Sequence, residues 1–167
     1  PMCSSLLPPN EKLLRRYPEL EVAYLSHTIE VDVVALDQVL EEEGLDGVDF
    51  LKIDVQGAAL EVFEGGQRAL RDAVGVCVEV EFVEVYKGQP LQGEVDVYMR
   101  RAGFNVHSFF TLGLRRLAGT AASDRDQLMW ADGLFFRSGE EWEGWKTTAP
   151  ERLLKLAVFA CLYGAYD

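Results

Sequence analysis

Polar residues at the end of a short apolar stretch are the first candidates for chemistry in this chain. Residues 48–54 (VDFLKID) have the length and composition of a buried strand, and Gln56 follows two positions later. The two-residue period of a strand places Lys52, Asp54 and Gln56 on one side. Because buried charges are costly without partners, Asp54 is either a structural group, in an ion pair or a helix cap, or a carboxylate of a site at the rim of the sheet. We favour the site carboxylate, which could take or orient a proton.

The next apolar stretch, residues 74–83 (VGVCVEVEFV), carries Glu79 and Glu81 on one face. If this strand lies beside the first, Glu79 can reach Lys52, and we interpret these two residues as a structural pair. Glu81 lies nearer the carboxyl end of the strand, where ligands of open α/β sheets bind, so we interpret it as a site residue. Tyr86 follows in a predicted loop, where functional groups tend to collect.

The elements that would position these residues alternate between strands and helices. The predicted strands span residues 29–36, 48–54, 74–83, 104–110 and 127–137. The predicted helices span residues 11–17, 37–43, 58–64 and 67–72. A further helix is predicted from the apolar residues 95, 98, 99 and 102, which share one helical face. Helices between buried strands are typical of βαβ crossovers, and they predict an α/β fold with a mainly parallel sheet. The last two strands have no helix between them and should form an antiparallel pair at one edge.

The last segment, residues 148–167, is predicted to be a C-terminal helix that packs on a first unit of residues 1–147 or extends from it. Thr148 and Glu151 have the spacing of a capping box, with Pro150 in the first turn. Apolar residues then follow at helical spacing: Leu154, Ala157, Val158, Cys161, Leu162 and Ala165. This apolar face could dock on its own sheet or on another subunit, so a homo-oligomer stays open.

Composition and charge argue against several classes of function. The chain has 167 residues with 28 acidic and 16 basic side chains, and its net charge is −12. This charge argues against binding to nucleic acids, whose phosphates need a positive surface, and against binding to anionic membranes. The three cysteines lie far apart, as expected of reduced thiols in a cytoplasmic protein, and the two histidines lack metal-ligand spacing, so we predict no metal site. The longest apolar stretch, residues 156–166, is too short to span a bilayer.

Several strings of residues resemble the FkbM-type methyltransferase family. The most specific is VDFLKIDVQG at residues 48–57; the others are VDVVALD at 31–37, VEVEF at 78–82, YKGQPL at 86–91 and WADGLF at 130–135. The resemblance covers most of the chain, from Ser4 onward. It implies a Rossmann-like fold, S-adenosylmethionine as the cofactor, and methyl transfer to a hydroxyl oxygen of a small molecule such as a sugar or a natural product.

The resemblance also implies roles for the polar residues described above. Asp54, and after it Glu81, would be the catalytic residues that take or orient the proton of the acceptor. Asp54 and Gln56 would contact the cofactor. Gln56, Glu81 and Tyr86 would contact the small-molecule acceptor.

The sequence departs from the family pattern in two places. Ala59 stands where the family usually carries a glutamate, and the glycine-rich cofactor loop of the family should lie before Ser4. We therefore expect a Rossmann-like sheet whose N-terminal, cofactor-loop half is missing from this sequence. The alternative is a truncated, non-catalytic Rossmann-like fragment that acts as a binding or interaction module.

Overall fold

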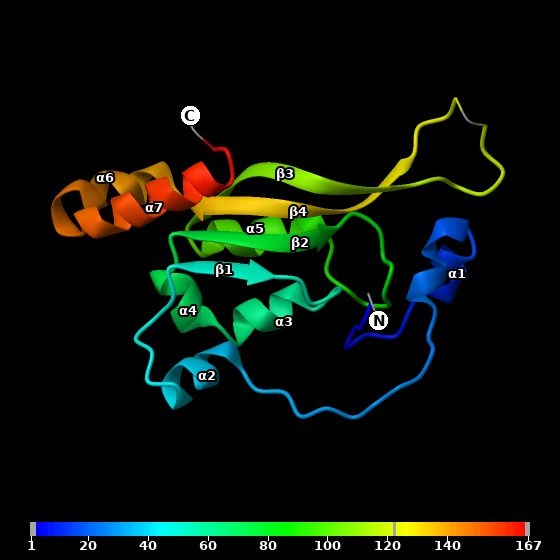
Figure 1. Ribbon diagram of the computed structural model, residues 1–167, viewed down its shortest axis with the longest axis horizontal. Coiled ribbons are helices and arrows are strands. Elements are labelled where there is room, and N and C mark those ends of the chain that lie inside the picture. Colours follow the sequence, from blue (N-terminus) through cyan, green and yellow to red (C-terminus); the bar gives the residue numbers. More distant parts are fainter. Residues whose placement is uncertain (1–2, 122, 166–167) are drawn as a thin grey trace.

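The computed structural model describes residues 3–121 and 123–165 and contains a four-stranded sheet in the order β1-β2-β4-β3 (Figure 1). The strands are β1 (Phe50–Ile53), β2 (Gly75–Glu81), β3 (Phe104–Arg115) and β4 (Gln127–Arg137). Only β1 and β2 are parallel, and β4 pairs antiparallel with both β2 and β3. The prediction of a mainly parallel sheet is therefore wrong, because β4 also pairs antiparallel with β2. The predicted antiparallel pair of the last two strands, β3 and β4, does lie at one edge of the sheet. The fold is a mixed α/β fold.

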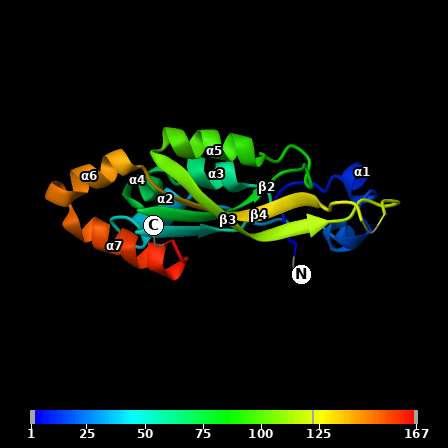
Figure 2. The ribbon, with the colours of Figure 1, turned by 90° about the horizontal axis from the view of Figure 1, so that it is seen from above.

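Helices cover both faces of this sheet (Figure 2). The helical elements are α1 (Glu11–Leu14), the 3-10 helix η1 (Pro18–Ala23), α2 (Leu36–Glu42), α3 (Ala59–Glu64), α4 (Gln67–Asp72), α5 (Gln92–Arg101), α6 (Gly139–Thr148) and α7 (Pro150–Leu162). Helices α3, α4 and α5 lie on one side, whereas α6 and α7 lie on the other side. Within the described part of the chain, no helix combines the length and the apolar character that crossing a membrane requires.

The alternation of side chains along β2 explains why both faces need cover. Val76, Val78 and Val80 are fully buried in the main core, against helices α3 and α5. Cys77 points to the opposite face and packs with Leu134 in the cluster beneath α6 and α7. At the carboxyl end of β2 this second face turns polar, and the helices α6 and α7 leave that part uncovered.

Arg137, the last residue of β4, joins the sheet to two helices. The side chain is 5% exposed, and its guanidinium lies over the ring of Phe104 at 4.1 Å from the ring centroid. Its N–H groups donate to main-chain carbonyls at the C-terminal ends of α4 and α5, namely those of Leu70, Arg71, Ala73 and Ala102. These carbonyls lack partners within their own helices, so one buried cation satisfies the ends of both.

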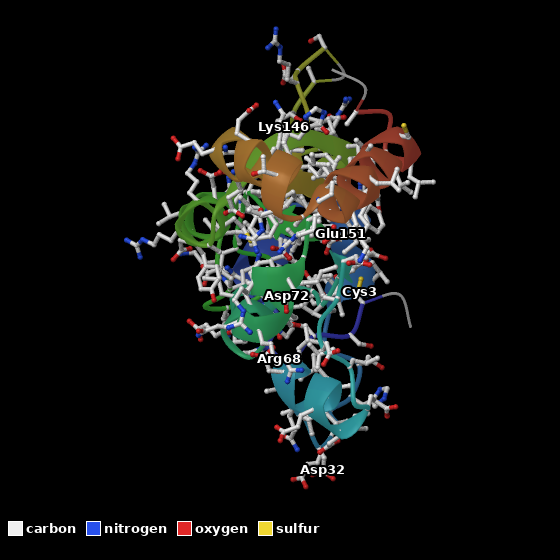
Figure 3. All side chains as sticks on the ribbon, turned by 90° about the vertical axis from the view of Figure 1, so that its left-hand side faces the viewer. Cys3, Asp32, Arg68, Asp72, Lys146 and Glu151 are labelled. Atoms are coloured by element: carbon white, nitrogen blue, oxygen red, sulfur yellow. The ribbon has the colours of Figure 1, made fainter. Side chains whose placement is uncertain are left out.

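The segment of residues 29–36 is not a strand, contrary to the prediction. It is extended coil up to α2, and its apolar side chains are exposed; Ile29 is 70% and Val33 69% exposed. The same coil carries Asp32, which lies at the outer tip of the molecule, away from the sheet (Figure 3). Alternation alone did not make a strand here, because no strand among the described residues pairs with this segment.

Asp37 caps helix α4 and not its own helix α2. Its carboxylate oxygens accept the main-chain N–H groups of Arg68 at 2.8 Å and Ala69 at 3.0 Å, in the first turn of α4. Helix α2, which contains Asp37, begins without a side-chain cap. The residue therefore fastens α2 to α4 and satisfies two N–H groups that α4 cannot pair internally.

The C-terminal helix differs from the prediction in its start and its orientation. Thr148 belongs to the end of α6 and donates to the carbonyl of Gly144, so it forms no capping box with Glu151. The predicted apolar face points outward, with Leu154 at 69% and Leu162 at 72% exposed. The opposite face packs on the sheet through Leu156, Phe159 and Tyr163; the rings of Phe159 and Tyr163 lie 4.4 and 5.4 Å from Phe50.

Candidate functional site

The candidate site lies where β1 and β2 end. The two strands are parallel, with Lys52 opposite Cys77 in the register, so both carboxyl ends reach the same edge of the sheet (Figure 1). We call this edge, together with the turn after β1, the rim. The sequence predicted Asp54, Gln56 and Glu81 as site residues and Glu79 as the structural partner of Lys52. The structure joins Asp54 and Glu79 through the amide of Gln56 and places Glu81 beside Gly57.

Gln56 is the centre of this arrangement. Its Nε2 donates to Asp54 Oδ1 at 2.9 Å and to Glu79 Oε1 at 2.6 Å, so each amide hydrogen has an acceptor. The Tyr86 hydroxyl lies 3.4 Å from Gln56 Oε1. The amide therefore links both carboxylates to the tyrosine and fixes their relative positions.

The turn that presents Gln56 has an unusual backbone. Gln56 has φ of +50° and Gly57 has φ of +95°, both in the region that L side chains rarely adopt. Gly57 also lies close to Gln89, whose Cβ would be 3.1 Å from a Cβ at position 57. Ser5 holds the turn from the other side, since its hydroxyl donates to the Gln56 carbonyl at 2.6 Å. The backbone thus aims the Gln56 side chain at the carboxylates.

Lys52 pairs with Asp132 on β4, not with Glu79 as predicted. The distance from Lys52 Nζ to Asp132 Oδ1 is 2.6 Å. The reason is the position of β4, which sets Asp132 directly opposite Glu79 and offers Lys52 a second carboxylate. Glu79 meanwhile accepts from Gln56. Asp132 was therefore missed as a member of the site; the available signal was that it shares a strand face with Trp130.

Glu81 is the most deeply buried carboxylate of the rim, at 4% exposed. Burial, and after it the charge of Glu79, raise the pKa of Glu81 to about 8. Hydrogen bonds from the main-chain N–H groups of Glu81 itself and of Gly57 act in the opposite direction and favour the ionised form. Glu81 therefore lies beside the turn that carries Gln56.

Glu79 is partly buried between other acids. Burial raises the pKa of Glu79 to about 7, with smaller contributions in the same direction from Asp54 and Asp132. Lys52 and the Gln56 amide act in the opposite direction, because they favour the charged carboxylate. Glu79 can therefore change its charge near neutral pH.

The remaining predicted site residues have contrasting surroundings. Asp54 is exposed at the tip of the rim. Tyr86 is 5% exposed and packs in a second hydrophobic cluster with Leu14, Tyr17 and Met129. Burial, and then Cys3, raise the pKa of the Tyr86 hydroxyl, so it stays a hydrogen-bond donor at neutral pH. The N-terminal segment thus reaches the site through Cys3 and Ser5, neither of which the sequence indicated.

The rim has an excess of negative charge. Four carboxyl groups, those of Asp54, Glu79, Glu81 and Asp132, lie near one cation, Lys52, and the raised pKa values of Glu79 and Glu81 reduce part of this negative charge at neutral pH. Among residues 3–121 and 123–165, no group of three or more histidine, cysteine, aspartate or glutamate side chains has the arrangement of a metal site. A cationic organic ligand fits this charge distribution.

Comparison with known proteins gives a consistent result. The family model described as the Methyltransferase FkbM domain matches residues 8–106. The 2-O-methyltransferase NoeI of Sinorhizobium fredii (strain NBRC 101917 / NGR234) is 36% identical over 70 residues, which cover 41% of this chain and 29% of NoeI. The chain therefore matches less than a third of the length of that relative. No solved structure matches the chain.

Proposed function

Because the chain belongs to the FkbM methyltransferase domain family, we propose that it contributes to methyl transfer from S-adenosylmethionine to a hydroxyl oxygen of a small molecule. The observation that carries this proposal is the group of carboxylates held by Gln56 at the carboxyl ends of β1 and β2. Open α/β sheets bind their ligands at this edge. The name of the relative NoeI describes transfer to oxygen, which supports an alcohol as the acceptor.

The charge of the rim fits the cofactor. When bound, S-adenosylmethionine would supply a methyl group on a positively charged sulfonium. Asp54 is the exposed carboxylate of the rim, and its charge would attract and orient that cation. Gln56 would keep Asp54 in place through the amide hydrogen bond of 2.9 Å.

The residues of the rim would act mainly by positioning. Transfer requires the acceptor oxygen, the methyl carbon and the sulfur in line, and fixing that geometry supplies most of the rate. A carboxylate that takes the hydroxyl proton adds about 10²–10⁴-fold. Glu81, which is buried against Gly57, would shape the turn that carries Gln56, and the Tyr86 hydroxyl would fix the orientation of the Gln56 amide.

We also propose that β1 is an inner strand of a larger Rossmann-like sheet. In the described residues β1 pairs only with β2, so one of its edges is open. Unpaired strand edges in folded proteins are normally covered or paired. The glycine-rich cofactor loop of the family would then belong to strands that pair along this open edge.

The proposal can be tested by measuring S-adenosylhomocysteine formation from S-adenosylmethionine with a panel of sugars and simple alcohols. Asp54→Asn is expected to lower the rate by at least about 10²-fold, because the rim loses its exposed charge. Asp32→Asn, on the exposed coil, serves as the matched control and should leave the rate unchanged. Calorimetric titration measures the binding of S-adenosylmethionine. A protein that neither forms product nor binds S-adenosylmethionine would contradict the proposed function.

A further inference from the structure

Glu79 is a carboxylate without a direct ion-pair partner in the described part of the chain. The charged groups that face it are Asp54 and Lys52 from the β1 side, Asp132 from β4, and Glu81 from its own strand. Lys52 is the one cation among them, and it is 2.6 Å from Asp132. Glu79 is therefore held by a neutral amide, and three other carboxyl groups and a single cation lie around it.

The two oxygens of Glu79 have different surroundings. Oε1 accepts the Gln56 amide at 2.6 Å. Oε2 has no hydrogen-bond partner among the described residues. The polar atoms that are both fully buried and without a partner do not include it, so Oε2 is accessible to solvent. One oxygen is thus fixed in place while the other is free to accept a proton.

The other carboxylates of the rim are less suited to this task. Glu81 is 4% exposed and tied to the main-chain N–H of Gly57. Asp132 is committed to Lys52. Asp54 is exposed, so water surrounds much of its carboxylate. Glu79 combines partial burial, a fixed orientation and a pKa of about 7, close to the value that favours general-base catalysis at neutral pH.

We propose that Glu79 is the residue that takes the proton of the acceptor hydroxyl, and that Gln56 is the positioning residue that holds it. This proposal rests on the methyl-transfer function proposed above. In the step, the acceptor oxygen forms a bond to the methyl carbon, the bond from that carbon to sulfur breaks with its electrons passing to sulfur, and the hydroxyl proton moves to Glu79 Oε2. Glu79 later releases this proton to water.

The first test follows the titration of Glu79 by NMR in protein with ¹³C-labelled glutamate carboxyl groups, and it needs no acceptor. Glu79→Gln identifies the signal. The wild-type midpoint is expected at about 7; Gln56→Leu should raise it, because the ionised form loses a hydrogen bond, and Asp54→Asn should lower it, because a like charge is removed. Gln38→Leu, which removes an exposed Gln38–Glu42 hydrogen bond, should leave it unchanged. An ordinary glutamate midpoint in the wild-type protein would overturn the proposal.

The second test separates this role from the proposed function. Glu79→Gln should lower the rate of S-adenosylhomocysteine formation by about 10²–10⁴-fold while S-adenosylmethionine affinity, measured by titration, stays the same. Gln56→Leu should shift the pH profile of the rate in the same direction as the NMR midpoint. An active wild-type protein whose Glu79→Gln variant is equally fast would overturn the role of Glu79 alone. A wild-type protein that neither binds the cofactor nor forms product would remove the proposed function, and this role with it.

Discussion

Lys52 on β1 reaches across the middle strand β2 to Asp132 on β4, with 2.6 Å between Nζ and Oδ1. The lysine side chain is 46% exposed, so the pair stabilises the fold by no more than about 1 kcal/mol. Its larger effect is on the charges of the rim. Because Asp132 takes the cation, Glu79 keeps a neutral partner and a pKa near neutrality.

Arg137→Met should destabilise the protein by at least about 3 kcal/mol. The substitution leaves buried carbonyls at the ends of α4 and α5 without their donor. Urea unfolding measures the loss. Arg100→Met is the control, since Arg100 is 56% exposed and pairs with Asp96 on its own helix, and it should leave stability almost unchanged. Equal effects of the two substitutions would refute the structural role of Arg137.

Asp37→Ala should cost about 1–2 kcal/mol, because α4 loses the acceptor for two N–H groups of its first turn. The same substitution at Asp32, on the exposed coil, should have almost no effect. Thermal and urea unfolding of both variants compares them directly. A stable Asp37→Ala protein would mean that the contact between α2 and α4 does not depend on this cap.

Two leucine-to-alanine changes on α7 distinguish its buried face from its exposed face. Leu156 is 8% exposed, and Leu156→Ala should cost about 2–4 kcal/mol. Leu154 is 69% exposed, and Leu154→Ala should change stability by about 0.5 kcal/mol or less. The reverse order, measured by chemical denaturation, would show that α7 packs through the face predicted from the sequence.

Glu81→Gln should change how stability depends on pH. Since burial raises the pKa of Glu81 from 4.5 to about 8 in the folded protein, that protein keeps its proton to higher pH than the unfolded chain does. The bound proton stabilises the folded protein fully at pH values below the pKa of Glu81 in the unfolded chain. This stabilisation is lost as the pH rises through the pKa of Glu81 in the folded protein, so the free energy of unfolding falls across this range.

Glutamine at position 81 cannot ionise, so the Glu81→Gln variant should lose this part of the fall in the free energy of unfolding, which is on the order of 3 kcal/mol. Urea unfolding at several pH values between about 5 and 8 gives the two curves. The control is Glu30→Gln on the exposed coil, whose curve should run parallel to that of the wild-type protein. A Glu81→Gln curve with the wild-type slope would refute the prediction.

The buried strands could be predicted from local sequence, whereas their neighbours could not. Residues 74–83 form an apolar stretch rich in valine, which is typical of a strand buried on both faces, and β2 lies within it. The alternating segment 29–36 satisfied the pattern of a strand equally well. It stays coil because a strand needs a partner along its edge, and local periodicity contains no information on partners.

The packed face of α7 was not predictable for a related reason. The helix is apolar on nearly all sides, so one stripe contains Leu154, Val158 and Leu162 and another contains Leu156 and Phe159. A helical period cannot choose between two apolar stripes. The choice is made by Phe50 on β1, whose ring stacks on Phe159.

The candidate site was predictable in part. The position of Asp54 and Gln56 after one parallel strand, and of Glu79 on the next, follows from the sequence because these strands are adjacent in the fold. The pairing of Lys52 depends on Asp132, which lies 80 residues later in the chain, and the register of that strand is set by long-range packing. The Ser5 contact depends on the path of an irregular segment, which no periodicity describes.

The place of β4 between β2 and β3 also has a consequence for synthesis on the ribosome. The twelve-residue β3 emerges first, yet its one strand neighbour in the described chain is β4. A nascent chain that ends before Gln127 can therefore assemble β1 with β2 but leaves β3 without a strand partner. The sheet is completed only when the hairpin of β3 and β4 docks on β2, which makes it a late event that closes the polar rim with Asp132.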